Sequence, residues 1–162
     1  MKIAGLFLLG LLMLYTQFIF APHIAIAGII PNLLIAYVIF ISTRLSQTAA
    51  TVLTFFIIIA FDVQMPCTFG LHTTVLLSVA WFISRYHAAI NKEKLISVSL
   101  SILLVVFSYI SLTTLFSLIS TQIVGANPYL FVLNVFYNTG ITIVLVYFFN
   151  LLSYLRITLN VR

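Results

Sequence analysis

The sequence predicts an all-α integral membrane protein, a bundle of six transmembrane helices that forms one membrane domain over residues 1–162. The first observation is composition. The chain is 64% hydrophobic and 6% charged, with a mean hydropathy of +1.28, whereas a soluble domain is about a quarter charged. So few polar side chains would leave a soluble fold with a mostly apolar surface. The second observation is that the apolar runs are continuous over helical lengths, which argues against a barrel of alternating strands.

Six apolar segments follow one another, at about residues 3–20, 30–43, 47–62, 70–86, 95–119 and 129–155. The first is followed by Ala25-Ile26-Ala27, which could be a signal-peptide cleavage site. Its apolar core is longer than the usual ~7–15 residues of a signal peptide, so we expect an uncleaved helix. In the second segment, Pro31 suits the first helical turn and Asn32 can accept hydrogen bonds from free backbone N–H groups there.

The second segment is short for a membrane span. About fourteen residues at ~1.5 Å each cover about 21 Å, less than the ~30 Å hydrocarbon core. It is therefore either buried in the bundle or extended through residues 25–28. The third segment ends in Asp62, and a turn that holds Pro66 and Gly70 leads to the fourth. A linker rich in turn residues, at 120–128, separates the serine-rich fifth segment from the sixth.

The third observation is that every cationic side chain falls on one side of six alternating segments: Lys2, Arg44, Arg85, Lys92, Lys94, Arg156 and Arg162. The connections at 21–29, 63–69 and 120–128 carry none. This positive-inside pattern predicts that both termini are cytoplasmic. The net charge of +5 then orients the helices, and we expect no nucleic-acid interface. Aromatic residues near segment ends are expected in the interfacial belts: Tyr15, Tyr37, Trp81, Tyr86, Tyr129 and Tyr154.

Asp62 is the only acid among the apolar segments, and the other acid of the chain is Glu93. A carboxylate in a membrane helix is costly unless it has a partner or water. Asp62 either caps the following turn at the water boundary or pairs with His72. One Asp and one His are too few ligands for a metal, and no nucleophile with an oxyanion hole accompanies them. The single Cys67 excludes an internal disulfide. We expect no catalysis and no cofactor.

Two polar stripes at helical spacing are expected to face other helices: Ser97, Ser101, Ser108 and Ser111, and Asn134, Asn138 and Thr142. Helix packing is favoured over cavity lining for the serines, because serine can also bond its own backbone. For the asparagine pair both readings stay open, since two amides are harder to satisfy locally.

Several of these residues together resemble the MreD family of bacterial rod shape-determining membrane proteins. The matching features are the Pro31-Asn32-Leu33-Leu34 opening of the second segment, a single Arg44 after it, Asp62 closing the third, and Gly70-Leu71-His72 opening the fourth. The match covers segments two to four. The other three segments match in length, topology and hydrophobicity only. The turn at 63–69 is bulkier than the glycine-rich stretch common in the family.

The resemblance implies a non-catalytic scaffold in the bacterial cytoplasmic (inner) membrane. It would bind MreC directly, within the elongation machinery that includes MreB and the RodA–transpeptidase pair and that maintains rod shape and lateral peptidoglycan synthesis. The implied fold is similar to the substrate-binding subunit of energy-coupling-factor vitamin transporters. An outward-facing pocket near Asp62, with His72, Asn32, Asn134 and Asn138, would then receive a segment of MreC. A homodimer stays open.

Two other functions remain to be weighed. A vitamin-transporter subunit suits the size, helix count and topology equally well. That family docks its partner through an Ala-x-x-x-Ala pattern in the first helix, whereas Ala4, Gly5 and Gly10 here lack the four-residue spacing. A membrane hydrolase would need several acids, histidines or serines at one depth, and only Asp62 and His72 qualify.

Overall fold

The computed structural model describes residues 3–65, 69–86, 95–121 and 127–160, with side chains at all of these except 95–97, 117, 119–121 and 155–160. The regular elements of this part of the chain are α1 (Ile3–Ile19), a 3₁₀ helix η1 (Ala21–Ile24), α2 (Leu33–Ser42), α3 (Gln47–Asp62), α4 (Leu71–Tyr86), α5 (Leu95–Thr121) and α6 (Pro128–Asn160). The prediction of an all-α chain is confirmed for the described residues. The remaining isolated feature is a β-bridge between Ile26 and Ile29.

The helix bounds follow the apolar runs closely, with two differences. Helix α6 continues to Asn160, and α2 begins at Leu33 rather than at residue 30. Asn32 has extended backbone angles and is the N-cap of α2, where its side chain accepts a hydrogen bond from Leu34 N–H. Pro31 therefore lies before the cap, and its expected place in the first helical turn is wrong. The chain therefore enters the bundle as extended backbone at Asn32, and α2 begins at the next residue.

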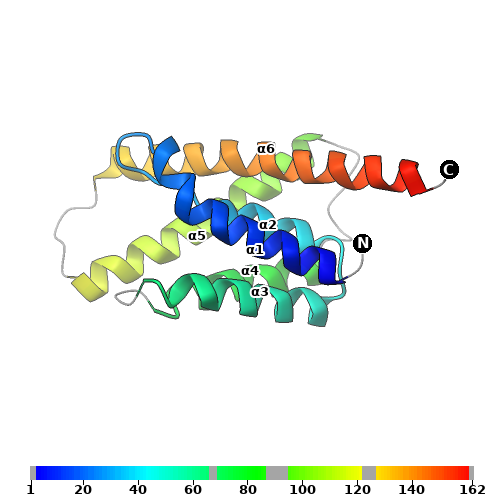
Figure 1. The fold of residues 1–162 in the computed structure, drawn as a ribbon. Helices are drawn as coiled ribbons and strands as arrows, with labels where there is room; N and C mark the ends of the chain where they lie inside the picture. Colours follow the sequence, from blue (N-terminus) through cyan, green and yellow to red (C-terminus); the bar gives the residue numbers. More distant parts are fainter. Residues whose placement is uncertain (1–2, 66–68, 87–94, 122–126, 161–162) are drawn as a thin grey trace.

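Helix α2 is the centre of the bundle. All ten of its residues are buried, and it packs against α1, α3, α4 and α6 (Figure 1). A helix that is apolar all round is expected inside other helices. At ~1.5 Å per residue it is about 15 Å long. Of the two explanations for the short second segment, the structure supports the buried helix.

The bundle has two distinct ends (Figure 1). We call the end with the beginning of α1 and the turn between α2 and α3 the inner end, and the end with η1 and the turn between α3 and α4 the outer end. Arg44 and Arg85, which follow α2 and close α4, are both at the inner end. The other cations named for the cytoplasmic side lie outside the described part of the chain: Lys2, Lys92, Lys94, Arg162 and the side chain of Arg156. Pro66 lies outside it too.

Helix α1 approaches α2 and α3 closely at Gly10. A Cβ atom there would lie 2.7 Å from the Tyr37 hydroxyl and 2.8 Å from Cγ1 of Ile57. Tyr37 is fully buried, and its hydroxyl donates to the carbonyl oxygen of Leu6 at 3.2 Å. The expected belt position of Tyr37 is therefore wrong, because α2 has no face toward the surroundings. The other five aromatic residues expected in the belts are all exposed.

The sides of the bundle, along the length of its helices, are strongly apolar. Val98–Phe116 and Pro128–Tyr154 are long and apolar enough to cross a membrane by length and composition. Large apolar side chains such as Leu104, Phe136 and Val144 are more than half exposed on these two helices. Soluble monomers rarely expose contiguous apolar surface on this scale, so the surface favours a lipid environment.

The serine stripe of α5 does not face the bundle throughout. Ser108 is exposed, and its hydroxyl donates to the carbonyl oxygen of Leu104 one turn back at 2.8 Å. Ser101 and Ser111 are half-buried, and the side chain of Ser97 is outside the described residues. The packing prediction is wrong for Ser108, because a serine that bonds its own helix needs no partner helix.

Candidate functional site

The beginning of α2 lies inside the bundle, where water cannot satisfy its free backbone groups. The N–H of Asn32 donates to Oδ1 of Asn138 at 2.7 Å. The N–H of Leu33 donates to Oε1 of Gln17 at 2.7 Å, and the N–H of Leu34 donates to Oδ1 of Asn32 at 3.0 Å. Gln17 also donates from Nε2 to the carbonyl oxygen of the residue before Asn32, at 3.0 Å. Side chains of α1 and α6 therefore complete the hydrogen bonding of the helix end.

The amide of Asn32 extends this set of bonds to α5. Its Nδ2 donates to the hydroxyl of Tyr109 at 2.6 Å. On α6, Nδ2 of Asn138 donates to Oδ1 of Asn134 at 2.6 Å and lies within hydrogen-bond distance of the Asn134 carbonyl oxygen. Asn138 is buried and Asn134 half-buried. Of the two readings left open for the asparagine pair, the geometry supports helix packing, because these amides bond to each other and to backbone.

Asp62 and His72 meet across the turn between α3 and α4. The Asp62 side chain is fully buried, and its Oδ1 lies 3.2 Å from Nδ1 of His72. The two atoms are at ion-pair distance without the alignment of a hydrogen bond. The other carboxylate oxygen, Oδ2, accepts from the N–H of Thr73 at 2.8 Å. Asp62 therefore caps the first turn of α4 and also faces His72.

The expectation that Asp62 sits at the water boundary is wrong, because its side chain has no exposed surface. Gly70 makes the close approach possible: its φ of +82° belongs to the left-handed region, which glycine adopts without strain. The chain then turns back into α4, where Leu71 is half-buried and His72 points toward α3.

Tyr109 lies between the two groups of polar residues. Its ring is 6.1 Å from the His72 ring, and its hydroxyl receives the Asn32 bond. Sequence reasoning missed both Tyr109 and Gln17. For Gln17 the available signal was an amide side chain inside an apolar segment, which in lipid usually marks a contact between helices. Tyr109 carries no such signal, because it stands in a segment with many hydroxyl side chains. We call the following seven residues the outer polar network: Gln17, Asn32, Asp62, His72, Tyr109, Asn134 and Asn138.

The contacts of the outer polar network indicate a structural role, which is to hold helix ends together. Among the residues that the structure describes, no group of three or more His, Cys, Asp or Glu side chains could hold a metal ion. Its members use their polar atoms mainly on backbone groups and on each other, across six helices. No family model, curated protein or solved structure matches this chain. Its function is therefore inferred from its own residues.

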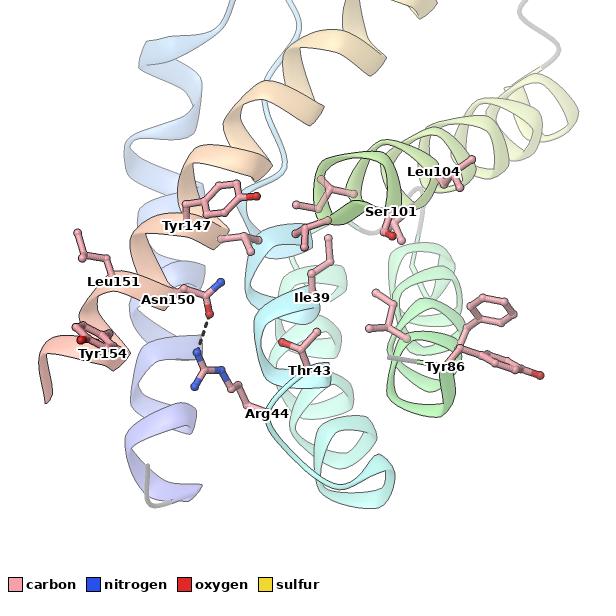
Figure 2. A pocket seen from close by; sticks show the side chains of 16 residues that line it. Ile39, Thr43, Arg44, Tyr86, Ser101, Leu104, Tyr147, Asn150, Leu151 and Tyr154 are labelled. Atoms are coloured by element: carbon pink, nitrogen blue, oxygen red, sulfur yellow. Dashed lines mark hydrogen bonds between the residues drawn. The ribbon is translucent and has the colours of Figure 1, made fainter. Parts of the chain in front are cut away.

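A cavity of about 1020 Å³ lies at the inner end, between α2, α4, α5 and α6 (Figure 2). Asp62 does not line it. The resemblance implies an outward-facing pocket near Asp62, which stays a prediction; the carboxylate itself has no exposed surface. Arg44, expected to be an orientation anchor, lies at this cavity and donates to Asn150 and Ser153 of α6.

Proposed function

We propose that this chain is a non-catalytic membrane scaffold of the bacterial cell-elongation machinery, which binds MreC at its outer end. One observation carries the proposal: three residues of the MreD-like motifs, from three separate helix ends, gather around one network at the outer end, while Arg44 lies at the inner end. Asn32 opens α2, Asp62 closes α3 and His72 opens α4, and Tyr109 adjoins both Asn32 and His72. We infer that motif residues which meet in this way share one structural role.

This role is to hold the outer end of the bundle in one conformation. Asp62 fixes the start of α4 through Thr73, and Gln17 fixes the entry of the chain into α2. The first outer connection is also tied to α6, because the Tyr137 hydroxyl donates to the carbonyl oxygen of Ile24. A surface that is already ordered binds a partner with less loss of conformational entropy. Such bracing suits a scaffold.

The outer connections present apolar side chains that a partner can cover. Seven large apolar residues are exposed there: Phe20, Ile24, Ile26, Ile30, Val63, Met65 and Phe69. Exposed apolar patches of this kind mark protein or membrane contacts. A membrane helix of MreC and the segment that follows it would cover such a patch at the membrane boundary. The buried network would then act through the shape of these connections rather than through direct contact.

The membrane assignment has independent support. Among the helices that the structure describes, two are long and apolar enough to span a bilayer, and the sides of the bundle are rich in exposed apolar side chains. The described cations Arg44 and Arg85 share the inner end. Together with the charge pattern of the sequence, these features favour a multi-pass protein of the inner membrane with its inner end toward the cytoplasm.

The test is co-purification with MreC, the two proteins being expressed together and extracted in mild detergent. Ile26→Ser and Phe69→Ser should each reduce the recovered MreC about tenfold, the effect of losing ~1.4 kcal/mol at an interface. Leu8→Ser is the matched control, since Leu8 is 64% exposed on α1, away from the outer connections. Equal recovery with all three variants would contradict the proposal.

Two further experiments test the role of Asp62 and distinguish a scaffold from a transporter subunit. If folded Asp62→Asn protein loses MreC, the carboxylate sets the shape that MreC recognises; an unchanged complex would limit Asp62 to capping α4. Depletion of the protein should make a rod-shaped cell round. A vitamin that co-purifies in stoichiometric amount, with normal cell shape after depletion, would instead indicate a transporter subunit.

A further inference from the structure

The cavity at the inner end, which we call the inner groove, is open along one side of the bundle. Helix α2 forms its floor, α6 and α4 flank it, and α5 crosses over it (Figure 2). Its rim includes Phe82, Leu104 and Leu151, each more than half exposed. Leu104 lies within the membrane-span candidate of α5. The groove therefore opens sideways toward the surroundings of the helices, where a lipid chain would be.

Arg44 is the cation of the inner groove. Its Nη2 donates to Oδ1 of Asn150 at 2.7 Å and its Nη1 donates to the hydroxyl of Ser153 at 3.1 Å (Figure 2). The guanidinium also lies 5.5 Å from the centre of the Phe40 ring. These contacts fix the position of the guanidinium. They do not neutralise its positive charge, because both acceptors are neutral. A guanidinium has five N–H donors, so donors remain for an anion.

No protein carboxylate balances this charge in the described part of the chain. Asp62 is the only acid there, and it closes α3 at the opposite end. Helix α3 has 16 residues, which separates its two ends by about 24 Å. The inner groove thus combines an apolar slot open to lipid with a fixed cation at the membrane boundary that no carboxylate of the described residues balances.

We propose that the inner groove binds an anionic phospholipid of the cytoplasmic leaflet, with the headgroup phosphate on Arg44 and an acyl chain in the slot. Arginine binds phosphate through paired charge-assisted hydrogen bonds. The apolar lining from Val98, Val105 and Val146 suits a hydrocarbon chain. The volume of about 1020 Å³ is at the upper end for small-molecule sites. A lipid site here is separate from the MreC surface at the outer end.

A second copy of this chain fits the inner groove less well. It would bring another Arg44 to the same membrane face, and its only acid besides the buried Asp62 is Glu93, between Lys92 and Lys94. Like charges oppose each other across such a contact. Charge complementarity therefore selects the lipid phosphate.

The test is native mass spectrometry of the full chain after equilibration with vesicles of palmitoyl-oleoyl phosphatidylglycerol or of the corresponding phosphatidylcholine. The wild-type protein should retain one phosphatidylglycerol and little phosphatidylcholine. Arg44→Gln should reduce the retained phosphatidylglycerol about tenfold, the loss expected when a charge-assisted contact is removed. Arg85→Gln, which removes an exposed cation of the same end outside the groove, should leave retention unchanged.

Two more variants keep the test decisive if Arg44→Gln destabilises the protein. Arg44→Lys keeps the charge and should retain the lipid, whereas Val105→Trp should fill the slot and lose it. Excess inorganic phosphate should not displace the lipid, because the acyl chain contributes to binding. Equal retention of both lipids, full retention by Val105→Trp, or crosslinking of a photoreactive residue at position 105 to a second copy of the chain would each overturn the proposal.

Discussion

Replacing Asn32 by alanine should destabilise the protein more than loss of a helix cap usually does. The substitution removes the acceptor for the Leu34 N–H and the donor to the Tyr109 hydroxyl. A buried N–H without a partner costs about 1–3 kcal/mol. A hydrogen bond between membrane helices contributes about 0.6 kcal/mol on average. The expected loss in the free energy of unfolding is therefore about 2–4 kcal/mol.

Asn127→Ala is the matched control for this prediction. Asn127 caps α6 through the same spacing, with its Oδ1 accepting from the N–H of Tyr129 at 3.0 Å, but it is exposed and has no described bond to another helix. An exposed cap of this kind contributes about 1 kcal/mol or less. Tyr109→Phe, which removes only the hydroxyl, should cost about as much as one interhelical bond.

The measurement is unfolding by titration with sodium dodecyl sulfate in mixed micelles, followed by the fluorescence of Trp81, the only tryptophan. A double-mutant cycle of Asn32→Ala and Tyr109→Phe should give a coupling energy of about 0.5 kcal/mol or more, since residues in direct contact do not behave additively. If Asn32→Ala and Asn127→Ala destabilise equally, the network does not support the start of α2 and the reasoning is refuted.

Three other predictions follow from the packing and the topology. Gly10→Ala should cost about 1–3 kcal/mol, because its Cβ would overlap neighbouring side chains, whereas Gly140→Ala in α6 has open space and should gain about 0.5–1 kcal/mol; unfolding titrations that rank them in the reverse order would contradict this. Gln17→Leu should lower the free energy of unfolding by about 2 kcal/mol, since it leaves a buried N–H without a partner; an unchanged midpoint would rule this out. In a cysteine-free background, a membrane-impermeant thiol reagent should label Val63→Cys in intact cells and should label Ser46→Cys only after lysis; the opposite pattern would reverse the topology.

The helices of this chain were largely predictable, because local sequence determines them. Apolar runs and turn residues mark the helix limits, and α3 begins and ends where the sequence predicts. The contact between Asp62 and His72 was also within reach, since only a short turn separates the two segments. Local chemistry acts over a few residues, and these features depend on nothing further away.

The features that were missed depend on residues far apart in the chain. The bond from Asn32 to Tyr109 joins residues 77 apart, and no pattern in α5 distinguishes that tyrosine from a belt residue. Tyr37 was placed at the interface because it is aromatic, but α2 is surrounded on all sides. The position of the inner groove depends on how α5 crosses the bundle. Tertiary packing determines all three features, and tertiary packing cannot be read from the local patterns of a single sequence.

The buried start of α2 has a consequence for how the protein is made. Asn32 bonds through its N–H to Asn138, which lies 106 residues later in the chain. At about 5–20 residues per second, the ribosome reaches Asn138 roughly 5–20 s after Asn32. During that interval the N–H of Asn32 lacks its Asn138 partner, whereas the N–H groups of Leu33 and Leu34 have acceptors already translated. Lipid offers no hydrogen-bond acceptor in its place. We therefore expect water or the insertion machinery to satisfy this N–H until α6 has been translated.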